Sequence, residues 1–158
     1  MKILGIESSC DETAASIVED GNSILSNVVV SQIDIHAAYG GVIPEIAARS
    51  HIEAILPVIH QSLTDANCDY QDLDAIAVTH TPGLVGSLLM GTLAARTVSI
   101  IQNIPFYPTH HLKSHIYANW LSGYQPTFPI LALVVSGGHT QIIYMKQHDD
   151  FHIIGTTH

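Results

Sequence analysis

Two histidines one helical turn apart give the clearest chemical signal in this sequence. His111 and His115 stand four positions apart where a helix is expected to begin. On a helix, side chains at positions i and i+4 lie on one face, about 5–6 Å apart at Cβ, so two imidazoles can bind one metal ion. The alternative is a pair of surface or helix-capping histidines in a chain that has 11 histidines. An isolated HxxxH pattern does not decide between them.

Two adjacent acidic residues, Asp11 and Glu12, lie in a polar turn at residues 7–13 between two expected strands. A carboxylate there could orient an attacking amine or take its proton. On their own, the residues favour a solvated turn or a strand cap. Cys10 of the same turn could be a nucleophile, but no histidine is visibly paired with it in the sequence, so a small packed thiol is favoured.

A second polar turn, Ser136-Gly137-Gly138-His139, follows the strand expected at residues 130–135. Backbone N–H groups of a glycine-rich turn can meet a phosphate with no side chain in between. A plain hairpin turn is an equal alternative, because glycine supplies positive φ for that purpose alone. His139 could reach a metal or cap the next strand, and the sequence leaves both open.

The composition is that of a globular protein. The chain has 158 residues, of which 47% are hydrophobic and 12% charged, and its net charge is −9 with only five basic residues. No cationic stripe is available for nucleic acid, so something else would have to hold such a substrate. Two cysteines without a CxxC pair, and no secretory leader, indicate a reducing cytosol. The apolar run 84–101, interrupted by Arg96, is expected to be a buried helix and not a membrane span.

Apolar periodicity predicts three strands followed by alternating helices and strands. The strands are expected at residues 2–6, 14–18, 23–31, 74–79, 105–109, 130–135, 140–146 and 151–155. Helices are expected from residue 44, at 84–102 and from residue 110. The first helix should lay an apolar stripe on the sheet, formed by Ile46, Ala47, Ile52, Ile55, Leu56, Ile59 and Leu63. A solvated surface is expected for the polar residues His36, Arg49, His51 and Glu53.

The predicted order resembles the α/β fold shared by actin, sugar kinases and the Hsp70-like chaperone ATPases. A ribonuclease H-like lobe with the order βββαβαβα is expected at residues 1–128. Residues 129–158 would be the first three strands of a second lobe that is truncated. In that fold the polar turns of the two lobes face each other across a cleft and bind nucleotide phosphates. Both turns are present in this chain, which favours a phosphate site.

Five motifs, in order, make the chain similar to the tRNA threonylcarbamoyl transferase family, which older descriptions call a glycoprotein endopeptidase. The match runs from residue 1 to about 155 and is far more specific than any single motif. The motifs are Gly5–Thr13 (GIESSCDET), Tyr39–Arg49 (YGGVIPEIAAR), Pro82–Leu88 (PGLVGSL), His110-His111 with His115, and Val135–Thr140 (VSGGHT).

The resemblance implies transfer of a threonylcarbamoyl group from threonylcarbamoyl-AMP to the N6 amine of the adenosine beside the tRNA anticodon. By position, His111 and His115 would bind iron or zinc, and Asp11 and Glu12 would lie on the acceptor side. An ATP- or ADP-like nucleotide is also possible as a ligand. The adenylate would contact Val134, Val135, Ser136, Gly137 and Gly138.

The resemblance also implies a cytoplasmic complex with a paralogous actin-fold subunit and a small ATPase, and no membrane. The tRNA would be bound through these partners or through the half of the protein absent here. An apolar sheet face and an open edge on the strands after residue 129 would favour a homo-oligomer of the fragment. The chain alone is therefore expected to be inactive.

Departures from the family pattern qualify these expectations. Lys113-Ser114 replaces the usual Glu-Gly between the two histidines, and Lys113 is expected to point away from the metal. Thr81 stands where glycine is usual, and Val134 where some relatives have a tyrosine ligand. Because an aspartate ligand would lie beyond His158, two histidines would leave the metal half coordinated.

Two other functions remain as alternatives. A metallopeptidase ranks low, because the HxxxH pattern lacks the glutamate that serves as general base in HExxH. A noncatalytic nucleotide-fold scaffold of the modification complex is the other. Retention of both His111 and His115 disfavours the scaffold for the parent protein, but not for the fragment.

Overall fold

The computed structural model describes residues 1–136 and 140–157. Two compact units are present, Met1–His111 and Leu112–His158. The second unit begins after His111, whereas the sequence places the lobe boundary after residue 128. The difference arises because Ile116 and Trp120 pack with the strands that follow them, in one small apolar cluster. The predicted lobe boundary itself stays a prediction.

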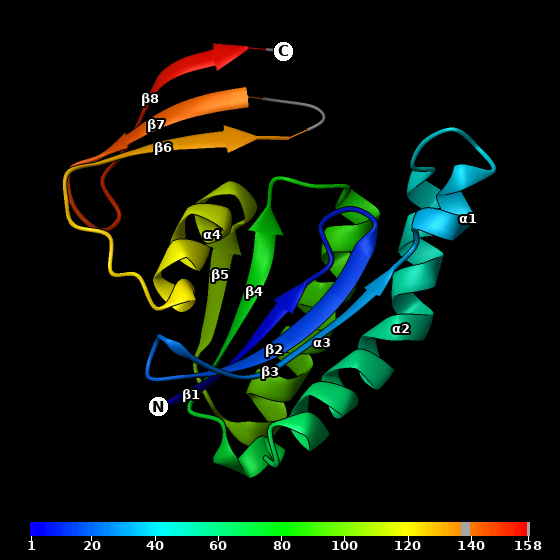
Figure 1. The fold of residues 1–158 in the computed structure, drawn as a ribbon. Coiled ribbons are helices and arrows are strands. Elements are labelled where there is room, and N and C mark those ends of the chain that lie inside the picture. The colour runs from blue at the N-terminus through cyan, green and yellow to red at the C-terminus, as the bar shows by residue number, and fades with distance from the viewer. Residues whose placement is uncertain (137–139, 158) are drawn as a thin grey trace. The chain divides into compact units, whose positions relative to one another are not determined.

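The first unit is built on a five-stranded mixed sheet with the strand order β3-β2-β1-β4-β5 (Figure 1). The pairs β1–β2 and β2–β3 are antiparallel, and β1–β4 and β4–β5 are parallel. The strands lie within two residues of the predicted ranges and confirm the predicted order. Their bounds are β1 Lys2–Glu7, β2 Glu12–Glu19, β3 Ser23–Ser31, β4 Ala75–Thr81 and β5 Phe106–His110.

Two long helices, α2 (Pro44–Asp65) and α3 (Val85–Gln102), lie side by side on one face of this sheet (Figure 1). Proline at the first helical position of α2 suits its start, since no intrahelical partner is lost there. The main core lies between the helices and the sheet. Each large side chain buried in it contributes about 1.5–3 kcal/mol. The largest apolar side chains of this core with no exposed surface are Leu4, Ile17, Ile59, Ile76 and Val78.

Helix α3 is only partly buried, which corrects the expectation of a buried helix. It packs along β4 and α2, and its buried residues are the small ones, Ser87, Gly91 and Ala95. By length and composition alone α3 would be able to cross a bilayer. Its packing on the sheet identifies it as a surface helix of the first unit. The apolar residues exposed on α3 are Val85, Leu89, Leu93, Ile100 and Ile101, and on α2 the expected stripe residues Ile52 and Leu56 are exposed too.

A short helix, α1 (Ile33–Ala37), was not predicted, and it buries His36. The Nε2–H of His36 donates to Gln32 Oε1 at 3.0 Å, and Nδ1 accepts from the backbone N–H of Ile43 at 3.4 Å. The expectation of a solvated His36 is therefore wrong. The ring ties α1 to the residue that precedes α2.

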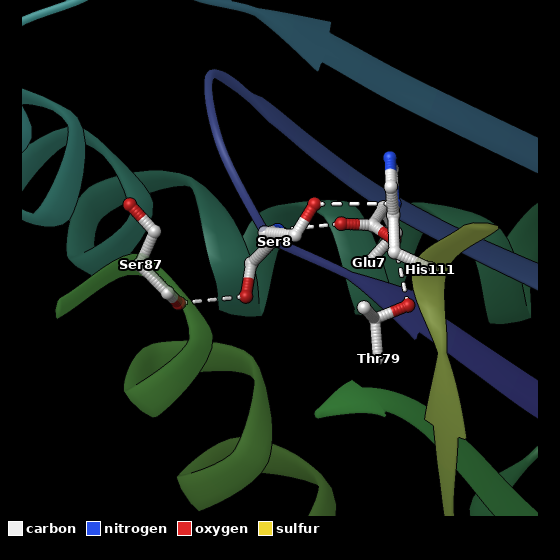
Figure 2. A network of polar contacts seen from close by, with 6 residues as sticks. Glu7, Ser8, Thr79, Ser87 and His111 are labelled. Atoms are coloured by element: carbon white, nitrogen blue, oxygen red, sulfur yellow. Dashed lines mark hydrogen bonds and ion pairs between the residues drawn. The ribbon is translucent and has the colours of Figure 1, made fainter. Parts of the chain in front are cut away.

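Helix α3 approaches the end of β1 closely through Gly91. The Ser8 hydroxyl donates to the Ser87 carbonyl at 2.8 Å (Figure 2) and accepts from the Gly91 N–H at 3.1 Å. A Cβ at Gly91 would lie 2.4 Å from Ser8 Oγ, so only glycine fits without movement. This contact fixes the start of the polar turn that follows β1.

The second unit holds a three-stranded antiparallel sheet with the order β6-β7-β8. Its small core contains Ile116, Ile143 and Met145. As expected, one sheet face is apolar and exposed, with Leu131 and Leu133 each more than 60% exposed. The elements are α4 His111–Tyr117, which begins at the last residue of the first unit, β6 Ile130–Val135, β7 Thr140–Met145 and β8 Phe151–Thr157. Two short 3-10 helices, η1 (Tyr70–Asp72) and η2 (Ala118–Ser122), complete the described elements.

Candidate functional site

Polar residues gather where the parallel strands of the first unit end. Glu7 is the last residue of β1, Thr79 lies near the end of β4, and His111 directly follows β5. Because β4 lies between β1 and β5 and runs parallel to both, the three strand ends meet at one edge of the sheet. The fold thus brings together residues that are 72 and 104 positions apart in the sequence.

The Glu7 carboxylate is the centre of this group (Figure 2). Its Oε1 accepts from the backbone N–H of Ser9 at 2.5 Å, and its Oε2 accepts from the Thr79 hydroxyl at 2.6 Å. Nδ1 of His111 lies 3.1 Å from Oε2 and 3.2 Å from Ser9 Oγ. The side chains of Glu7 and His111 are each 31% exposed, so the group can be reached from solvent.

The hydrogen bonds at Glu7 decide its protonation state. Burial alone would raise the pKa of Glu7, but hydrogen bonds from His111, Ser9 and Thr79 outweigh it and lower the pKa to about 2. The hydrogen bond to Glu7 raises the pKa of His111, against the opposite effect of burial. Glu7 is therefore ionised at neutral pH and accepts hydrogen bonds only.

His51 of α2 makes hydrogen bonds on both sides of the turn that carries Asp11 and Glu12. His51 has no exposed surface; its Nε2–H donates to the Cys10 carbonyl at 3.0 Å, and its Nδ1 lies 2.7 Å from Thr13 Oγ1. These contacts fix the backbone on both sides of the two acids. The expectation of a solvated His51 is wrong, because this side chain points into the unit while its helix neighbours Arg49 and Glu53 are exposed.

The surroundings of Glu12 make its carboxylate a better base than a free one. Burial raises the pKa of Glu12, and the negative charges of Asp11 and Glu7 raise it further, while His111 acts in the opposite direction. A carboxylate with a raised pKa accepts a proton more readily. Burial, reinforced by Asp11, also raises the pKa of the Cys10 thiol to about 11. A protonated thiol agrees with the prediction of a packed and not a nucleophilic cysteine.

The two predicted metal ligands both lie in α4, one turn apart. Because Nδ1 of His111 faces Glu7 and Ser9, Nε2 lies on the opposite edge of its ring, which is the arrangement that metal-binding histidines adopt. His115 is exposed. Among residues 1–136 and 140–157 no group of three or more His, Cys, Asp or Glu side chains forms a complete metal site. The role of His111 and His115 as metal ligands stays a prediction.

Lys113, between the two histidines, is engaged elsewhere. Its ammonium lies 4.2 Å from the centre of the Phe151 ring, in a cation–π contact. The positive charge is thus held by an aromatic ring of β8, and the prediction that Lys113 points away from a metal stays a prediction.

The predicted adenylate segment belongs to the second unit. Val134 and Val135 end β6, and Val135 pairs with Thr140 of β7. Val135 and the following Ser136 are exposed. The predicted contacts Gly137 and Gly138, and also His139, lie outside the described residues. The role of this segment stays a prediction.

Sequence reasoning missed the two residues that hold the predicted ones in place. Glu7 was included only in a motif, although an acidic residue at the end of a central parallel strand is itself a signal for a site. His51 was assigned to a helix surface. Its two partners, Cys10 and Thr13, lie 41 and 38 positions away and carry no local signal.

The order β3-β2-β1-β4-β5 and the polar strand ends define a chain of the actin-like, ribonuclease H-like ATPase fold. Two solved structures agree with this class. YeaZ from Pseudomonas aeruginosa aligns with a TM-score of 0.59 at 15% identity, covering 99% of this chain and 68% of that one. The Aquifex aeolicus PPX-GPPA enzyme aligns with a TM-score of 0.50 at 11% identity, covering 99% of this chain and 51% of that one.

The family is shown by sequence: the chain belongs to the tRNA N6-adenosine threonylcarbamoyltransferase family, whose model matches residues 23–158. Curated proteins of that name are close relatives. The Bacillus subtilis relative is 56% identical over 157 residues, which is 99% of this chain and 45% of that protein. The relative from Dehalococcoides mccartyi strain CBDB1 is 55% identical over 157 residues, 99% of this chain and 48% of that protein. The chain thus spans about half the length of the curated relatives it matches.

Proposed function

We propose that the protein to which this chain belongs transfers the threonylcarbamoyl group of threonylcarbamoyl-AMP to the N6 amine of an adenosine in tRNA. Membership of the transferase family supports the reaction. The observation that carries the proposal is the Asp11–Glu12 turn, where Glu12 has a raised pKa and lies within electrostatic reach of Glu7 and His111. A base and a candidate cation-binding histidine thus belong to one end of the sheet.

In the proposed reaction the adenosine amine attacks the carbamoyl carbon of the donor. A carbon–nitrogen bond forms, the bond from that carbon to the adenylate oxygen breaks, and AMP leaves with the bonding electrons. Glu12 would take the proton lost by the amine, and the adjacent Asp11 would keep the pKa of Glu12 raised and orient the amine. His51 would hold both acids in place through Cys10 and Thr13.

We further propose that His111 and His115 hold an iron or zinc ion, with remaining ligands from water or from the rest of the protein. When bound, the cation would supply Lewis-acid stabilisation of donor oxygens. The segment from Val134 to Gly138 would contact the adenylate through backbone N–H groups. An ATP- or ADP-like nucleotide would use the same segment.

The partners are part of the proposal. A net charge of −9 with five basic residues gives this chain little affinity for phosphates, so tRNA would be bound by other subunits or by other parts of the protein. We propose a paralogous actin-fold subunit and a small ATPase as those subunits, in the cytoplasm. The exposed apolar face of β6–β8 would make the isolated chain self-associate, which the mass of the chain in solution tests.

A chimera tests the reaction. The 157 matched residues of this chain replace their counterparts in the Bacillus subtilis relative, and the purified chimera is given threonylcarbamoyl-AMP and tRNA. We expect the modified nucleoside to form, and Glu12→Gln to slow its formation by about 100-fold or more, since a general base contributes at least that much. Glu53→Gln, on the exposed face of α2, is the matched control. A folded chimera that keeps its rate after Glu12→Gln would exclude Glu12 as the base.

A further inference from the structure

The hydrogen-bond inventory at Glu7 fixes which nitrogen of His111 carries a proton. Oε1 accepts a hydrogen bond from the backbone N–H of Ser9, a group that can only donate. Oε2 lies within hydrogen-bond distance of both the Thr79 hydroxyl and His111 Nδ1. Both oxygens of Glu7 act as acceptors, since Oε1 accepts from the Ser9 N–H and Oε2 from the Thr79 hydroxyl, so Nδ1–H of His111 is the donor in its contact with Oε2. A neutral His111 then carries its hydrogen on Nδ1 and its lone pair on Nε2.

We propose that Glu7 is a positioning residue that sets the ring orientation and the Nδ1–H tautomer of His111, which puts the lone pair that can bind a cation on Nε2. The inference deepens the proposed function and rests on its metal site. Carboxylates that accept the second N–H of a metal-binding histidine act in this way elsewhere, and their loss weakens metal binding about 10–100-fold.

The position of Glu7 suits this role because its own orientation is fixed. Thr79 is buried in β4, and Ser9 is buried in the turn after β1. Glu7 makes two short hydrogen bonds, one with the Thr79 hydroxyl and one with the Ser9 N–H, and together they hold both carboxylate oxygens. The third bond, to His111, is the longest of the three. The two short bonds therefore orient the carboxylate, and the carboxylate orients the ring.

A purely structural role for Glu7 is the alternative. Glu7 links residues at the ends of β1, β4 and β5, and its loss would destabilise the unit whatever the tautomer of His111. Stability alone does not separate the two roles. The tautomer of His111 does separate them, because only the positioning role requires the hydrogen on Nδ1 to depend on Glu7.

The Glu7→Gln variant separates the positioning role from the structural role with almost no change in side-chain shape. The amide oxygen stays on the Ser9 N–H, so the amide nitrogen takes the place of Oε2 and donates to His111 Nδ1. The hydrogen of His111 must then move to Nε2, where it blocks a cation. Thr79→Val is the control, since it removes a bond to Glu7 but keeps the carboxylate beside His111.

The first measurement is the imidazole 15N spectrum of the metal-free chain at a pH where His111 is neutral, assigned with His111→Ala. We expect the Nδ1–H tautomer in the wild type and Thr79→Val, and the Nε2–H tautomer in Glu7→Gln. An Nε2–H tautomer in the wild type would overturn the proposal even if Glu7→Gln does not fold. So would a folded Glu7→Gln variant that keeps Nδ1–H.

Zinc titration of the same proteins gives a second readout that needs no enzyme activity. Affinity should fall about 10–100-fold in Glu7→Gln and much less in Thr79→Val. Unchanged zinc affinity in a folded Glu7→Gln would contradict the proposal. A wild type that shows the Nδ1–H tautomer and yet binds no zinc would contradict the proposed metal site in this chain. That result would still support the role of Glu7 at His111.

Discussion

Single residues at this sheet edge depend on partners far away in the sequence. The Glu7 carboxylate is stabilised by residues of β4 and α4, and the pKa of Glu7 falls to about 2 although burial opposes it. A carboxylate whose folded-state pKa is depressed stabilises the fold above its unfolded-state pKa, and loses that contribution as the pH falls towards the folded value. The relevant window here runs from the ordinary glutamate pKa of 4.5 down to a pKa of about 2.

Acid should therefore remove the contribution of Glu7. We expect Glu7→Gln to be less stable than the wild type by about 1–3 kcal/mol at about pH 5, after allowance for solvent screening, and the difference to shrink towards about pH 2.5. His111 is protonated in the folded and unfolded chain throughout this range, so it adds no slope. Urea unfolding at the two pH values, with Glu53→Gln as control, measures the effect. An equal difference in the free energy of unfolding between the wild type and Glu7→Gln at both pH values would contradict the expected contribution of Glu7.

His51 offers a second test at the same scale. His51→Leu removes both ring hydrogen bonds and leaves the Thr13 hydroxyl and, in part, the Cys10 carbonyl without a partner. An unsatisfied buried polar group costs about 1–3 kcal/mol, so the free energy of unfolding should fall by about 2–3 kcal/mol. His60→Leu, on an exposed position of the same helix, should change little. Similar urea midpoints for both variants would show that His51 does not anchor the turn.

At the scale of elements, β1 and α3 are in direct contact at one glycine. Gly91→Ala would gain up to about 1 kcal/mol of helix propensity, but its Cβ would lie 2.4 Å from Ser8 Oγ. Overpacking of this kind costs about 1–3 kcal/mol, so a net loss of stability is expected. Gly41→Ala, where a Cβ meets nothing within 4 Å, is the control. Thermal unfolding that shows Gly91→Ala more stable than the wild type would contradict the contact.

The elements themselves were largely predictable from the sequence. Alternating apolar residues and the Asp20-Gly21 turn predicted β3 with its observed bounds and β2 within two residues at each end. Helix α1 was missed, because five residues are too short for a periodic pattern and no side chain caps its start. The exposure of α3 was missed because its composition is apolar on most sides, and small residues, not large ones, face the sheet.

The candidate site was predictable in part. Its chemically obvious residues, Asp11, Glu12 and His111, could be named from type and motif. The partners that orient them could not, because the contacts of Glu7 with Thr79 and His111 depend on which strands lie side by side. His51 was misassigned because one helix position in a polar run points inward.

At the scale of the whole molecule, the chain has one well-packed unit and one small unit with an exposed apolar sheet face. The curated relatives continue for about as many residues again. The first unit already carries the acidic turn and the Glu7–His111 pair.

Modified nucleoside in cellular tRNA tests this account most directly. The experiment uses cells in which the chimera described above is the only transferase of this family. Mass spectrometry then measures threonylcarbamoyladenosine in the tRNA of these cells. We expect normal levels with the chimera and clearly lower levels with its Glu12→Gln variant, because loss of a general base slows the transfer by about 100-fold or more. Equal levels of the modified nucleoside with the chimera and with its Glu12→Gln variant would contradict the proposal that transfer takes place at this edge of the sheet of the first unit.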